Sequence, residues 1–147
     1  MKKIVLLFVF LTAISCKKED KCDGIDCFTP PQTFIFELVD KTTGDNLFTT
    51  GSLNSSEITV VDENTTSVNF NFISENNLNL IELSEIGWNM GLNYYTVKVD
   101  SIEFTIFLEM ESKHENCCWF FSVKQFNISN YLFEQSNATG VYKIIIE

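Results

Sequence analysis

The amino-acid sequence predicts an all-β protein whose main domain is an antiparallel β-sandwich of about seven or eight strands. From residue 33 onward, short runs alternate apolar with polar residues, which is the period of a strand that has one buried face. Groups rich in Asn, Asp, Gly and Thr separate these runs and predict the turns. No run of ten or more residues has the period of an amphipathic helix. Two sheets bury the apolar faces of such strands against each other.

The first half of this domain contains four predicted strands. Residues 33–40 (TFIFELVD) form the first strand and run into a turn rich in Thr and Gly. Residues 57–62 (EITVVD) and 66–73 (TSVNFNFI) flank Glu63-Asn64-Thr65 and therefore predict a hairpin. Residues 78–83 (LNLIEL) predict the fourth strand, and a loop follows it.

The second half begins with a predicted hairpin. Residues 94–100 (YYTVKVD) and 101–110 (SIEFTIFLEM) meet at Asp100-Ser101, and the second of these strands places all its even-numbered apolar residues on one face. Residues 111–116 (ESKHEN) are hydrophilic and predict a loop.

Two further strands close the predicted domain. Residues 117–128 (CCWFFSVKQFNI) form a long aromatic strand. Its apolar residues change from odd to even positions near Lys124-Gln125, which predicts a β-bulge there. Residues 140–147 (GVYKIIIE) predict the last strand.

One segment carries a resemblance to a known class of sandwich. Residues 36–48 (FELVDKTTGDNLF) run from a strand into D-x-x-T-G and then into apolar residues. This stretch resembles the first hairpin of prealbumin-like and carboxypeptidase-regulatory-like domains. The resemblance implies an immunoglobulin-like or prealbumin-like sandwich, and it implies no activity.

The N-terminus has the pattern of an export signal. Lys2 and Lys3 precede an apolar run of 11 residues (4–14), which is too short for a membrane-spanning helix of about 20 residues. Ser15-Cys16 follows, and this ending resembles the looser lipobox of Bacteroidota-type lipoproteins, although Ala13 stands where Leu is common. The resemblance implies that residues 1–15 are removed and that Cys16 is acylated and holds the protein in the bilayer. Plain secretion after a cut at the same place is the alternative.

The residues after Cys16 suggest where the domain is displayed. Lys18-Glu19-Asp20 resembles the surface-export signal of Bacteroidota-type lipoproteins. It implies a lipid-anchored outer-membrane protein exposed at the cell surface, and a protein that faces the periplasm is the alternative. We interpret residues 16–32 as a charged tether and residues 33–147 as the sandwich domain.

The charge of the chain excludes one class of partner. The full chain has a net charge of −10, and removing Lys2 and Lys3 with the signal leaves 10 − 2 = 8 lysines against 20 acidic residues, or −12. A nucleic-acid partner is excluded because its binder needs a basic surface that replaces phosphate counterions.

Four cysteines remain after the anchor: Cys22, Cys27, Cys117 and Cys118. Behind an export signal, an even number predicts disulfides. A bond between Cys117 and Cys118 would join neighbours in the chain, so we expect both to pair with the tether, in either order. Closing a loop of about 90 residues stabilises by roughly 4–5 kcal/mol in the chain-entropy model. Free thiols, or a zinc site completed by His114, are the alternatives.

The candidate chemical groups are few. His114 is the only histidine, and with its acidic neighbours it suggests a small hydrolase or a metal-dependent enzyme as one hypothesis. Its hydrophilic surroundings favour a solvated loop, and motifs for a serine nucleophile, a zinc protease or a phosphate loop are lacking. Asp100-Ser101-Ile102 resembles the O-glycosylation motif of Bacteroidota-type exported proteins, which marks Ser101. Four aromatic residues suggest a sugar-stacking platform: Trp88, Tyr94, Tyr95 and Trp119.

The sequence therefore favours a non-enzymatic binding or accessory module of the bacterial envelope, with no cofactor and no metal. Its ligand would be a protein or a glycan. An inhibitor or immunity-type surface protein is a third hypothesis.

Overall fold

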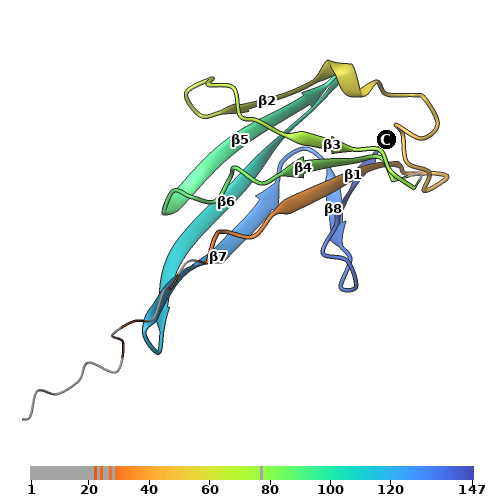
Figure 1. Ribbon diagram of the computed structural model, residues 1–147. Coiled ribbons are helices and arrows are strands. Elements are labelled where there is room, and N and C mark those ends of the chain that lie inside the picture. The colour runs from red at the N-terminus through yellow and green to blue at the C-terminus, as the bar shows by residue number, and fades with distance from the viewer. Residues whose placement is uncertain (1–21, 23, 25–26, 28, 77) are drawn as a thin grey trace, which may run out of the picture.

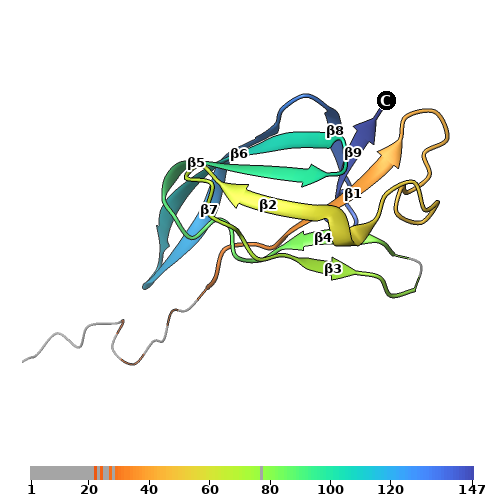
Figure 2. The ribbon, with the colours of Figure 1, turned by 90° about the horizontal axis from the view of Figure 1, so that it is seen from above.

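A computed structural model describes residues 22, 24, 27, 29–76 and 78–147, and this part of the chain folds into two packed β-sheets (Figures 1 and 2). The predicted lipidation site Cys16 and the export run of Lys18, Glu19 and Asp20 lie outside the described residues. The described elements are one 3-10 turn, η2 (Ser55–Glu57), and nine strands: β1 (Phe34–Asp40), β2 (Ile58–Asp62), β3 (Asn71–Ile73), β4 (Leu80–Leu83), β5 (Gly91–Val99), β6 (Ile102–Glu115), β7 (Cys118–Ile128), β8 (Leu132–Gln135) and β9 (Tyr142–Ile146).

The predicted β-sandwich is confirmed. One sheet has the strand order β3-β4-β1-β9-β8 and the other has the order β2-β5-β6-β7. Every pair of neighbouring strands is antiparallel except β1 and β9, which run parallel with Phe36 beside Tyr142. The first and last strands of the domain therefore lie side by side in the middle of one sheet, so the sandwich closes only when the C-terminal strand is in place.

The core lies between the two sheets and is apolar. It is formed by the alternate residues of each strand that point inward, as the period of two requires. Phe36 of β1 and Phe104 of β6 are both fully buried and bring the sheets together, with ring centroids 6.4 Å apart. The other fully buried large side chains are Phe34, Leu38, Val60, Ile81, Leu83, Ile86, Val97, Ile106, Leu108 and Ile144.

The predicted bulge is confirmed at Lys124. Gln125 pairs with Glu109 and Val123 pairs with Met110, so Lys124 is the extra residue of β7. The extra residue changes the phase of the strand. It therefore lets Val123 and Phe126 both face inward, which explains the shift from odd to even apolar positions.

The predicted hairpin between residues 57–62 and 66–73 forms only next to its turn, where Asp62 N–H donates to the Thr66 carbonyl and Val68 N–H to the Val60 carbonyl. Only Val61 and Ser67 form a bridge after the turn, and the chain then crosses to the other sheet, where β3 pairs with β4. The turn itself is stabilised by Asp62, whose carboxylate accepts the N–H groups of Asn64 and Thr66 at 2.9 and 2.8 Å. Alternating apolar residues mark a strand with one buried face but do not identify the neighbouring strand. The pairing of residues 71–73 was therefore not predicted.

Two other expectations are corrected. Residues 111–115 belong to β6 rather than to a loop, because the strand continues past the sandwich, where neither face is buried and the apolar pattern stops. The edge strand β8, which makes nine strands in the described part of the chain, was missed because it is short and mostly exposed.

Candidate functional site at the disulfide-tied hairpin

The β6–β7 hairpin extends beyond the five-stranded sheet, at the end of the sandwich opposite to the C-terminus (Figures 1 and 2). We call its projecting part, residues 111–123, the hairpin arm. Every second side chain of β6 is buried from Ile102 up to Met110, and residues 112–115 are all exposed. Asn116 and Cys117 make the tight turn, with Asn116 at a φ of 54°, a left-handed conformation that Asn adopts more readily than most residues.

Two disulfides join the tether to the tip of this arm. Cys22 is bonded to Cys117 and Cys27 to Cys118, with Cα–Cα distances of 5.3 and 5.2 Å. The prediction that both tip cysteines pair with the tether is confirmed, and the order of pairing is now assigned. Cys117 lies in the turn and Cys118 begins β7, so the neighbours reach two partners without sharing a regular strand.

A strip of aromatic residues runs along one face of the hairpin arm. Trp88 packs edge-on against Phe121, with ring centroids 5.4 Å apart. Phe121 and Trp119 share a face of β7 because they are two residues apart. Trp119 in turn lies against His114, whose ring centroid is 4.6 Å from its own. We call these four residues the aromatic strip. Trp119, nearest the tip, has 63% of its surface exposed.

The base of the arm is packed against the end of the tether. Pro31 is buried, and its Cβ lies 3.1 Å from the position that a Cβ atom at residue 87 would occupy. Gly87 also has a φ of 89°, which L side chains rarely adopt, so this approach depends on glycine. The segment that leads into β1 is thus held to the sandwich at Pro31 and to the arm tip through the two disulfides.

The lysine at the β-bulge forms an ion pair. Lys124 Nζ donates to Glu109 Oε1 at 2.6 Å on the outer face of the sheet. This carboxylate raises the pKa of Lys124, first through the hydrogen bond and then through its charge. The pair is exposed, so it contributes little to stability.

A polar hollow of about 220 Å³ opens at the side of the sandwich. Burial raises the pKa of the Tyr95 phenol at the inner end of this hollow. Amide, carboxylate and phenol groups in one hollow can hold a polar ligand such as a sugar. The hollow is lined by Asp62, Glu63, Asn64, Ser67, Val68, Glu85, Asn89, Asn93, Tyr94 and Tyr95.

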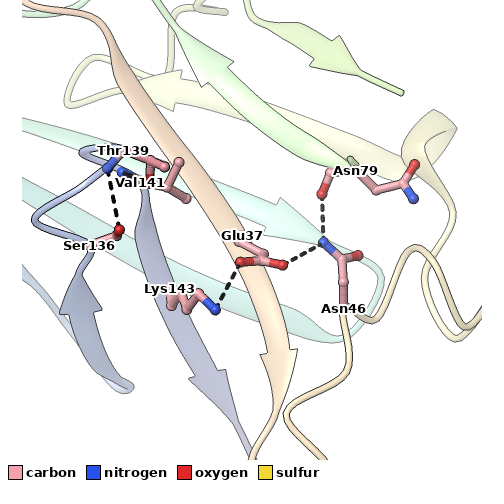
Figure 3. A network of polar contacts seen from close by, with 7 residues as sticks. All are labelled: Glu37, Asn46, Asn79, Ser136, Thr139, Val141 and Lys143. Carbon is pink, nitrogen blue, oxygen red and sulfur yellow. Dashed lines mark hydrogen bonds and ion pairs between the residues drawn. The ribbon is translucent and has the colours of Figure 1, made fainter. Parts of the chain in front are cut away.

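The end of the molecule away from the arm carries a structured loop between β1 and η2. Asn46 anchors it: its Nδ2 donates to the Asn79 carbonyl at 2.8 Å and approaches Glu37 Oε1 at 3.4 Å (Figure 3). Its Oδ1 accepts the N–H groups of Phe48 and Thr49 at 3.0 and 3.1 Å. One amide thereby joins the loop to β1 and to the start of β4.

We expect Asn46→Ala to destabilise the domain by about 1–3 kcal/mol, because it leaves several partners of one half-buried amide unsatisfied. Urea unfolding measures the change. The matched control is Asn71→Ala, which removes a single exposed bond to Glu82 and should cost less than about 0.5 kcal/mol. Equal costs for the two variants would contradict the anchoring role of Asn46.

The structure separates the aromatic residues that the sequence grouped as a sugar platform. Tyr95 is in the core at 7% exposure, and Tyr94 packs edge-on against Phe107 on the outer face of the sheet. Trp88 and Trp119 belong to the aromatic strip. The four residues do not form one surface, because alternation along β5 sends Tyr94 and Tyr95 to opposite faces.

The remaining predicted residues lie far apart. Ser101 is exposed in the β5–β6 turn, at the end of β6 opposite to the tip. His114 is exposed on the arm and forms no ion pair with a described residue. Among the described residues, no group of three or more His, Cys, Asp or Glu side chains is placed to hold a metal ion. The contribution of Phe121 to the strip was missed, since its contact with Trp88 of the β4–β5 loop depends on the tertiary fold and on no local pattern.

No helix within the described ranges is long and apolar enough to cross a membrane. Comparison with known proteins gives no match to a family model, to a curated protein or to a solved structure.

Proposed function

We propose that this chain is a lipid-anchored protein of the bacterial envelope, displayed at the cell surface, that acts as a non-enzymatic binding or accessory module. The observation that carries the proposal is the pair of disulfides between the tether and the hairpin arm. Disulfides persist in oxidising compartments outside the cytosol, which agrees with the export signal before Cys16.

Three further observations support this role. The lipobox-like Ser15-Cys16 supplies an acylation site. The described domain is a β-sandwich with a hollow suited to a polar ligand. Its single histidine lies on the aromatic strip, beside Trp119, which favours a binding surface over a proton-transfer site.

The test of the anchor is Cys16→Ser. We expect this variant to lose metabolic labelling by a fatty-acid probe and to move from the membrane fraction to the soluble fraction, because an unacylated chain has no lipid to hold it. Ser15→Ala is the matched control and should still be labelled, since it keeps a small residue before the cysteine. Labelling that persists in Cys16→Ser would contradict the proposal.

Surface display has its own assay. Protease added to intact cells should cleave the wild-type protein, and replacement of Lys18, Glu19 and Asp20 by neutral residues should protect it until lysis. Protection of the wild-type protein would instead indicate a domain that faces the periplasm.

A further inference from the structure

The position of the disulfides determines how far the sandwich can lie from its anchor. The sequence places Cys22 six residues after Cys16 (22 − 16), and Cys22 is bonded to Cys117 at the arm tip. Six residues span at most about 20 Å. Without the disulfides, the first point of attachment to the domain would be Pro31, fifteen residues after Cys16 (31 − 16), and the reach would rise to about 50 Å.

The point of attachment also changes. Pro31 lies at the base of the hairpin arm, beside Gly87, whereas Cys117 lies at its tip. A domain held at Pro31 by a long chain can present any face to the membrane. A domain held at the tip by a chain of about 20 Å keeps the tip close to the surface.

The arm tip has the side chain that suits this location. Trp119 is 63% exposed, and it extends the aromatic strip toward Cys117 and Cys118. Tryptophan is enriched where membranes meet water, because its ring is apolar and its N–H needs a polar partner. At that layer the exposed ring of Trp119 would lie against lipid while its N–H still reaches water or a headgroup.

Electrostatic attraction would not hold the arm tip at a membrane surface. The mature chain carries 8 lysines against 20 acidic residues, and Lys113 on the arm is paired with Glu111 at 3.0 Å. An acidic domain is not drawn to an anionic surface. The short covalent link from Cys16 to the arm tip would therefore keep the arm at the membrane surface. Trp119 then needs only a modest affinity for lipid.

From these observations we propose that the hairpin arm stands on the membrane that holds Cys16, with Trp119 in the lipid headgroup layer. The inference rests on the proposed acylation of Cys16. The 14 residues of β6 then extend away from the bilayer for about 45 Å. They place the Ser101 turn and the Asn46-anchored loop at the outer end, where a partner can reach them.

The experiment uses the full acylated protein in vesicles of phosphatidylcholine and phosphatidylethanolamine that contain lipid with a spin label near the headgroup. Trp88→Phe leaves Trp119 as the only tryptophan, and Trp119→Phe leaves Trp88. We expect the spin-labelled lipid to remove most of the fluorescence of Trp119 and much less of that of Trp88, which packs on Phe121 farther from the tip.

A third sample distinguishes the effect of the short disulfide-bonded tether from the affinity of Trp119 for lipid. In the Trp88→Phe background, replacing Cys22, Cys27, Cys117 and Cys118 by Ser should abolish most of the quenching of Trp119, because the reach of the anchor grows. Quenching that survives this change would overturn the role of the disulfides.

The outcomes distinguish the two proposals. Protein that floats with the vesicles and carries acyl mass, but whose Trp119 is not quenched, overturns the membrane-facing arm and leaves the lipoprotein proposal standing. If Trp119 of the acylated protein escapes quenching only at high protein concentration, a second copy covers the aromatic strip. That result also overturns the membrane-facing arm. Protein without acyl mass that fails to float overturns both.

Discussion

Phe104→Ala should lower the free energy of unfolding by about 3–5 kcal/mol, which is a large part of the 5–15 kcal/mol typical of a whole domain. Phe104 is fully buried on the inner face of β6, opposite Phe36 of the other sheet. Its removal both loses apolar burial and leaves a cavity between two sheets whose backbones are held by hydrogen bonds on either side. Collapse of the cavity is therefore limited, and we expect the cost to lie in the upper part of the range.

The matched control lies three residues along the same strand. Phe107 is half-buried on the outer face, where it packs against Tyr94 with ring centroids 5.3 Å apart. Phe107→Ala should cost about 1 kcal/mol, mainly the lost aromatic contact. Urea unfolding of both variants tests the assignment of inner and outer faces, and a larger effect for Phe107 than for Phe104 would refute it.

Removal of both disulfides should destabilise the domain by roughly 2–4 kcal/mol, while removal of either one should cost less than about 1 kcal/mol. Each bond closes nearly the same loop, with sequence separations of 95 and 91 residues. One bond alone therefore restricts the unfolded chain almost as much as both do. The total is smaller than the loop length alone suggests, because the tether before Pro31 also gains freedom in the folded protein when both bonds are lost.

The variants are Cys22→Ser/Cys117→Ser, Cys27→Ser/Cys118→Ser and the combination of all four changes. Denaturant unfolding should show strong non-additivity, with the combined cost well above the sum of the two pair deletions. Wild-type protein in excess reductant serves as the control and should match the combined variant. Additive costs would mean that the two bonds restrict different loops, which contradicts the pairing.

The sequence predicts the fold best where a strand has one face in the core. The even-numbered residues from Ile102 to Met110 are all apolar because their side packs between the sheets, and this inward face was predicted correctly even though Phe107 lies on the other side. The phase change at Lys124 is informative for the same reason: only a residue added to one strand lets both halves keep their apolar side inward.

Prediction fails where burial stops or where pairing is distant. Residues 111–116 were interpreted as a loop because residues beyond Met110 leave the sandwich and lose the alternating pattern. The parallel pairing of β1 with β9 joins strands about a hundred residues apart, and no local pattern reveals a neighbour at that distance. The order of the disulfides could not be predicted either, since it depends on which tip cysteine lies in the turn.

One measurement tests the central claim, that a lipidated tether is tied to the hairpin arm: the intact mass of the protein extracted from membranes, taken without reductant. We predict a chain that begins at Cys16, carries a diacylglycerol and a further acyl group, and lacks the four thiol hydrogens of Cys22, Cys27, Cys117 and Cys118. A mass without acyl groups would contradict the anchor, and a mass that retains the four hydrogens would contradict the tie to the arm.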